Sequence, residues 1–83
     1  MQYLILCRSV TYAQKAARLL QDSGIFASVT KAPQSANPGG CTYGAKVGAR
    51  NLDRAVELLR GAGLYRGKVF SVSPRGEFEE VEP

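Results

Sequence analysis

The chain has 83 residues, which is enough for one small domain and leaves no room for a second one. Hydrophobic residues make up 45% of it and charged residues 22%, a composition typical of a globular protein and not of a disordered chain. It has no His and only two Cys, which excludes imidazole chemistry and leaves too few ligands for a structural zinc site or a disulfide framework.

The charge is unevenly distributed along the chain. Residues 1–75 hold all 11 basic residues and three acidic ones, a net charge of +8, whereas residues 76–83 hold four Glu and no basic residue. Such a basic body can attract nucleic acid, an anionic ligand or an acidic protein surface, although most charges of this kind lie on solvated helix faces. No apolar run is long enough to cross a bilayer and no secretory signal is visible, so we expect a cytoplasmic protein.

The hydrophobic pattern predicts alternating strands and helices. The first half reads as a strand at 2–8, a helix at 10–23 that Ser9 caps and Gly24 ends, and a strand at 26–32. The second half reads as a loop at 33–40, a strand at 43–49, a helix between Asn51 and Gly63, and a strand at 67–73. We therefore expect one domain over residues 1–74, followed by an acidic, flexible tail over residues 75–83.

The two halves are similar to each other. Residues 17–25 align without gaps on residues 56–64, and each aligned segment covers a helix end with its terminal Gly. Two βαβ-like halves predict an α+β fold, a ferredoxin-like βαββαβ two-layer sandwich in which two helices cover one face of a four-stranded antiparallel sheet. We expect the first and third strands to be central and to run in the same direction.

Cys41 is the candidate reactive residue. It stands at the junction between the predicted loop and the third strand, where a partner can reach it. The surrounding residues would present the thiol or support it electrostatically; they are Pro38, Gly39, Gly40 and Thr42 in the loop, and Lys31 and Lys46 in the flanking strands. Amide N–H groups and lysines around a thiol make the sulfur a competent nucleophile. A small residue packed under the loop is the alternative. We expect no metal and no cofactor.

Cys7 lies inside the apolar first strand, where a free Cys usually packs as a small hydrophobic residue. With the first and third strands running in the same direction, strand rise separates Cys7 from Cys41 by roughly 16 Å. A disulfide needs Cα atoms within about 7 Å. We therefore expect the two thiols to act separately.

Several segments together resemble the Se/S carrier protein-like family of small bacterial domains. They are Tyr3-Leu4-Ile5-Leu6, the helix residues Ala13, Ala16, Leu19 and Leu20, then Gly24-Ile25, Lys31-Ala32-Pro33 and Gly40-Cys41. The resemblance covers roughly residues 3 to 72. In the family the Cys is commonly followed directly by Gly, whereas here Thr42 and Tyr43 stand before Gly44.

This resemblance implies that Cys41 carries a persulfide, or the equivalent selenium, between a cysteine desulfurase-like donor and an acceptor protein. A carrier of this kind needs one nucleophilic thiol and no pocket, metal or general base, so we expect a carrier and not a self-sufficient enzyme. A flexible Gly-Gly hairpin would suit the handover, and a basic surface would speed docking to acidic partners.

The alternative is a non-catalytic binding or assembly module. Tyr3, Tyr43 and Phe70 could form one RNA-binding surface, although they are scattered over three strands and nucleic acid is not the expected partner. Arg8 and Ser9 could hold an anion at a helix start. The first strand is apolar on both faces, which favours a homodimer, or a partner, that covers an open sheet face.

Overall fold

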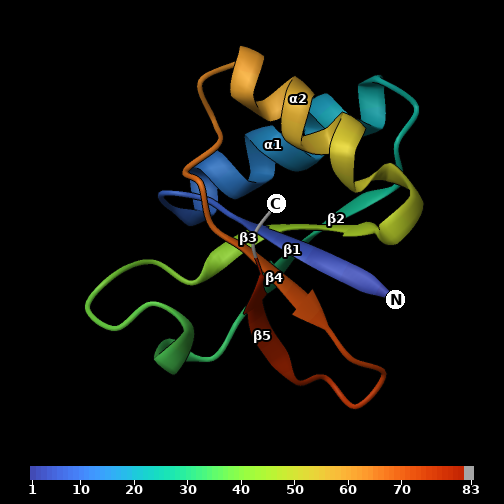
Figure 1. Cartoon of the computed structure of the whole chain (residues 1–83). Helices are drawn as coiled ribbons and strands as arrows, with labels where there is room; N and C mark the ends of the chain where they lie inside the picture. Colours follow the sequence, from blue (N-terminus) through green and yellow to red (C-terminus); the bar gives the residue numbers. More distant parts are fainter. Residues whose placement is uncertain (82–83) are drawn as a thin grey trace.

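The computed structural model in Figure 1 describes residues 1–81 and has two helices above one sheet. The strands are β1 (Gln2–Leu6), β2 (Ala27–Lys31), β3 (Tyr43–Gly48), β4 (Val69–Val72) and β5 (Phe78–Val81), and the helices are α1 (Val10–Asp22) and α2 (Leu52–Gly61). Single 3₁₀ turns lie at Gln34–Ala36 and Ala49–Asn51. Helices and strands lie where the sequence predicted them, to within one to two residues at most ends.

The sheet has five strands in the order β2-β3-β1-β4-β5, not the four that we expected. Its first four strands follow the order of a ferredoxin-like sandwich, and β5 extends the sheet beyond β4. The additional strand lies in the segment expected to be a flexible tail, where it pairs with β4. Residues 82–83 of that segment lie outside the described residues. The structure is thus an α+β domain that matches the ferredoxin-like arrangement only roughly.

The expectation that the two central strands run in the same direction is wrong. All neighbouring strands are antiparallel, and β1 pairs with β3 from Gln2 opposite Gly48 to Leu6 opposite Gly44. The connections explain this direction: the α1 crossover makes β1 and β2 run the same way, and the loop after β2 turns β3 back. The end of β1 therefore lies beside the beginning of β3.

The main core lies between the helices and the sheet. It is built from small and branched residues of α1, α2 and the central strands, among them Ile5, Cys7, Ala13, Leu20, Ala45 and Leu59, each without exposed surface. Alanines on α1 let that helix lie close to the sheet, because a methyl group takes little space between the two layers. We call this cluster the helix-side core.

A second, smaller core lies on the opposite face of the sheet. Its buried residues are Leu4, Leu6, Ala32, Phe70 and Val72, and Ala36 and Phe78 pack against them. The 3₁₀ turn and β5 therefore cover the face that we expected to be open to solvent. The chain itself buries the apolar residues that suggested a homodimer, and they no longer support one.

The alternative of an aromatic surface on one sheet face is also wrong. Tyr3 and Tyr43 pack against the helix-side core, whereas Phe70 belongs to the second core on the other face. In an antiparallel ladder, neighbouring positions point to opposite faces, and this alternation separates the three rings.

The internal similarity extends to the ends of the two helices. After α1, the Ile25 N–H donates to the Leu20 carbonyl at 2.8 Å, and after α2 the Leu64 N–H donates to the Leu59 carbonyl at 2.8 Å. Gly24 and Gly63 have φ values of 83° and 73°, a left-handed conformation that favours glycine at a helix end. Among the described residues, no helix is long and apolar enough to span a bilayer.

Candidate functional site

The loop between β2 and β3 is organised by hydrogen bonds from two amide side chains. The Asn37 side chain donates to the Cys41 carbonyl at 2.9 Å, and the Gln34 side chain donates to the Gly40 carbonyl at 3.0 Å. The Gly40 N–H in turn donates to the Asn37 carbonyl at 3.0 Å. These contacts tie the thiol-bearing end of the loop to the 3₁₀ turn, which packs on the second core through Ala36.

The two glycines before Cys41 have separate structural roles. Gly39 has a φ of 76°, a conformation that residues with a Cβ rarely adopt. Gly40 lies against the Asn37 side chain, and a Cβ there would collide with the amide nitrogen of Asn37. The Gly-Gly pair thus permits the turn and leaves space for the side chain that holds it.

Cys41 is half-buried and has a hydrogen-bond donor at its sulfur. The Tyr43 backbone N–H lies 3.4 Å from the Cys41 Sγ and donates to it. Thr42, between them, is 2% exposed, and its carbonyl accepts a 2.9 Å hydrogen bond from the Ala32 N–H. The pairing of β2 with β3 therefore continues through Thr42 and fixes the backbone next to the thiol.

The two lysines predicted to support Cys41 are placed differently. Lys31 is paired with Tyr43 across β2 and β3, and its ammonium group lies 5.8 Å from the centre of the Tyr43 ring. It thus shares Tyr43 as a neighbour with Cys41. Lys46 is paired with Leu4, on the face of the second core, and lies five residues beyond Cys41, or roughly 17 Å at strand rise. The structure does not bring Lys46 to the thiol.

Cys7 is fully buried in the helix-side core, as we expected of it. Its Sγ lies 3.6 Å from the Ile5 carbonyl oxygen, to which it donates. Burial raises the pKa of the Cys7 thiol from its ordinary value of 9.0 to about 11. The Ala45 backbone lowers this pKa, the charge of Cys41 raises it, and Arg66 lowers it.

The two thiols lie near each other, contrary to the expectation of roughly 16 Å. The Cys7 N–H donates to the Tyr43 carbonyl at 3.0 Å, so Cys7 lies opposite Tyr43, and Cys41 precedes Tyr43 by two residues. Diagonal neighbours of this kind in an antiparallel pair are about 7–8 Å apart. The proximity of the two cysteines could have been predicted from the sequence, because the direction of β3 follows from its connections.

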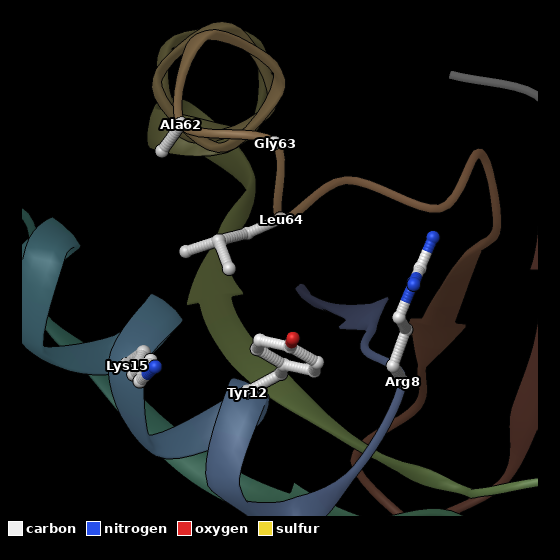
Figure 2. A pocket seen from close by; sticks show the side chains of 6 residues that line it. All are labelled: Arg8, Tyr12, Lys15, Ala62, Gly63 and Leu64. Atoms are coloured by element: carbon white, nitrogen blue, oxygen red, sulfur yellow. The ribbon is translucent and has the colours of Figure 1, made fainter.

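A cavity of about 430 Å³ opens beside the same end of β1, between the start of α1 and the end of α2. Arg8, which directly follows Cys7, lines it together with Tyr12, Lys15 and Leu64. In Figure 2 the Tyr12 ring lies between the two basic side chains and below Leu64. The Lys15 ammonium group is 5.4 Å from the centre of this ring. Both charged residues of the lining are thus cationic, and Arg8 is the one that we considered as an anion ligand.

Within residues 1–81, no group of three His, Cys, Asp or Glu side chains is placed to hold a metal ion. The described site offers two thiols: one half-exposed sulfur with a backbone donor, and one buried sulfur just after the neighbouring strand. The fold and this site define a small α+β domain that presents a cysteine at a loop–strand junction.

Comparison with known families agrees with this description. The model of the family described as Putative Se/S carrier protein-like matches residues 2–71, which is most of the chain, and the protein belongs to this family. The match confirms the resemblance found in the sequence. No curated protein and no solved structure matches the chain significantly.

Proposed function

We propose that the protein is a sulfur or selenium carrier that holds the transferred atom on Cys41. The observation that carries the proposal is the unequal placement of the two thiols. Cys41 is half-buried at the end of an ordered loop, where a partner can reach it, whereas Cys7 has no exposed surface. Membership of the Se/S carrier-like family supports the same role.

The proposed loading step is a thiol–persulfide exchange. The Cys41 sulfur attacks the terminal sulfur of a persulfide on a cysteine desulfurase-like donor, and the donor thiolate leaves with the electron pair of the broken S–S bond. Cys41 then carries the persulfide and passes its outer sulfur to an acceptor. The step consumes no oxidant or reductant and requires no general base, so a single thiol on a carrier suffices.

The hydrogen bonds around Cys41 favour a loop that holds the thiol in a fixed position over a flexible loop. We expected a flexible hairpin, but Asn37, Gln34 and the packing of Ala36 hold the loop against the body of the domain. A sulfur that is held in one place lowers the entropy lost when it is aligned with a partner's sulfur.

The distribution of charge supports docking to acidic partners. Residues 1–75 carry a net charge of +8, and the cavity beside Cys7 is lined by Arg8 and Lys15. Such a surface steers an acidic donor toward the thiol-bearing end of the sheet, and salt weakens this attraction.

Incubation of the reduced protein with a cysteine desulfurase and cysteine tests the proposal. Cys7→Ala, in which Cys41 is the only thiol, should gain one sulfur atom, about 32 Da, and peptide mapping should place it on Cys41. Cys41→Ser should gain none. An increase that persists in Cys41→Ser, or that maps to Cys7, would show that the assignment is wrong.

A further inference from the structure

We propose that Cys7 is the resolving thiol of Cys41: it attacks the inner sulfur of a persulfide on Cys41, closes a Cys7–Cys41 disulfide and releases the outer sulfur as sulfide. This inference rests on the proposed carrier function and names a residue to which that function gives no role. It follows from the antiparallel pairing of β1 and β3, which brings the two thiols to one end of the sheet.

Backbone hydrogen bonds place the two thiols beside each other. The Cys7 N–H donates to the Tyr43 carbonyl, and the Tyr43 N–H donates to the Cys41 Sγ. The N–H and the carbonyl of one strand residue point toward the same neighbouring strand. The Cys41 sulfur therefore lies on the side of Tyr43 that faces Cys7.

The separation is close to that of a disulfide. Diagonal neighbours across an antiparallel pair are about 7–8 Å apart, and bridged cysteines have Cα atoms within about 7 Å. Closure to the usual disulfide spacing of about 5.5–6 Å thus requires a shift on the order of 2 Å. Cys41 can make this shift at the cost of the hydrogen bond from Tyr43 N–H to its sulfur and of the Asn37 contact.

The direction of attack suits release to solvent. Cys7 is buried in the helix-side core, whereas Cys41 is half-exposed. An outer sulfur on Cys41 therefore has room on the solvent side, away from Cys7. A nucleophile that attacks the inner sulfur from the buried side expels the outer sulfur from the opposite, solvent-facing side, as in-line displacement requires.

The step balances without a further reagent. One persulfide, Cys41–S–SH, and one thiol, Cys7–SH, give one disulfide and one molecule of hydrogen sulfide. The dithiol is oxidised by two electrons, and the released sulfur takes up these electrons and the Cys7 proton. A cellular thiol or dithiol reductant then restores both thiols for the next cycle.

This chemistry also defines the class of acceptor. If the outer sulfur first displaces a leaving group from an electrophilic carbon of a substrate R–X, X⁻ departs with the electron pair of the R–X bond and Cys41 holds the mixed species Cys41–S–S–R. Attack by Cys7 then closes the same disulfide and frees R–SH. A carrier with a resolving thiol thus delivers sulfur at the oxidation level of sulfide to an electrophile, which a carrier with one thiol does only with help from an external thiol.

The test follows sulfur and disulfide together in the persulfide-loaded, desalted full-length protein. We expect wild type to release one sulfide per protein and to become about 2 Da lighter than the reduced form, with Cys7 and Cys41 joined in one peptide pair. Loaded Cys7→Ala and Cys7→Ser should keep the added sulfur and release sulfide at least about tenfold more slowly. Circular dichroism verifies that both variants are folded.

The outcomes separate this inference from the carrier function. If the desulfurase does not load Cys41, the carrier function fails, and loading with inorganic polysulfide still tests the Cys7 step. If loaded wild type keeps its sulfur as firmly as Cys7→Ala, or joins Cys41 to Cys41 of a second molecule instead of to Cys7, the resolving role is wrong. Mapping of the disulfide in wild type needs no variant and settles the assignment should both substitutions unfold the protein.

Discussion

The backbone N–H of Cys7 donates to the carbonyl oxygen of Tyr43 at 3.0 Å, one position beyond the Leu6–Gly44 pair that ends the β1–β3 ladder. This single contact places a buried thiol beside the residue whose own N–H donates to the Cys41 sulfur. Tyr43 therefore contacts both sulfur-bearing residues through its backbone, and the two cysteines belong to one local arrangement.

The thiols should differ strongly in their reaction with N-ethylmaleimide under native conditions. Cys41 is half-exposed and Cys7 has no exposed surface, so we expect Cys41 to react at least about 100-fold faster. Mass spectrometry of timed samples measures both rates, and the single-thiol variants Cys7→Ala and Cys41→Ser provide the assignments. Similar rates at the two positions would contradict the burial of Cys7.

Stability should fall at alkaline pH because of Cys7. Its pKa is about 11 in the folded protein against an ordinary 9.0 in the unfolded chain, so the unfolded chain releases this proton first. The contribution is present in full below pH 9, is lost as pH rises from about 9 to 11, and amounts to at most about 3 kcal/mol.

Urea unfolding at several pH values measures this loss. Wild type should lose more stability between pH 8 and pH 11 than Cys7→Ala, which lacks the group but retains Cys41 and all tyrosines and lysines. Parallel stability curves for the two proteins would mean that the Cys7 thiol does not titrate differently on folding.

Gly44 should not tolerate a side chain, although it lies in a regular strand. A Cβ at this position would collide with the backbone carbonyl oxygen of Ile5 and lie 3.1 Å from a methyl carbon of Leu4. Backbone cannot yield as a flexible side chain does, so Gly44→Ala should lower the free energy of unfolding by about 2 kcal/mol or more.

Gly48→Ala is the matched control in the same strand. Gly48 has open space around its Cα and an ordinary φ of −73°, so its substitution should change the free energy of unfolding by less than about 0.5 kcal/mol. Equal losses for the two variants, measured by urea unfolding, would be inconsistent with the close approach of β1 and β3 at Gly44.

Phe78 should stabilise the domain and keep it from associating. It is half-buried, pairs with Val72 and packs on the second core. Phe78→Ala should lower the free energy of unfolding by about 1–3 kcal/mol and expose Phe70 and Val72, which promotes concentration-dependent association. Light scattering and urea unfolding measure both effects. Glu79→Ala, at an exposed neighbouring position, should change neither the free energy of unfolding nor the association. If Phe78→Ala behaved like Glu79→Ala, Phe78 and β5 would not contribute to stability.

The sequence predicted the order of the first six helices and strands because most have a clear hydrophobic period and a clear end. The stripe of α1 recurs at helical spacing and ends at Gly24, and the strands at 2–8 and 43–49 are apolar or alternate. The direction of β3 was also accessible, since a helical crossover followed by a short return loop permits only one direction. Because we expected β3 to run in the opposite direction, we expected Cys7 and Cys41 to lie roughly 16 Å apart.

Two other features, the strand β5 and the Asn37 contact in the loop, depend on tertiary contacts and could not be predicted from the sequence. In β5, Phe78 and Val81 flank two exposed glutamates, a pattern that does not alternate, and its strand form depends on pairing with β4. Likewise, nothing in the composition of residues 33–40 indicates that the Asn37 side chain would reach the Cys41 carbonyl. Prediction from sequence placed Cys41 at the loop–strand junction but did not find the contacts that hold it there.

The loop that presents Cys41 also covers part of the second core, through Ala36. A large outward swing of the thiol would therefore uncover apolar residues such as Leu4 and Leu6 to water. The Cys41 sulfur is therefore held at a fixed position on the surface of the domain. In the proposed transfer, the movement that brings two sulfur atoms together would therefore come from the donor or the acceptor, whose own reactive group would need a mobile arm or a shallow, open site.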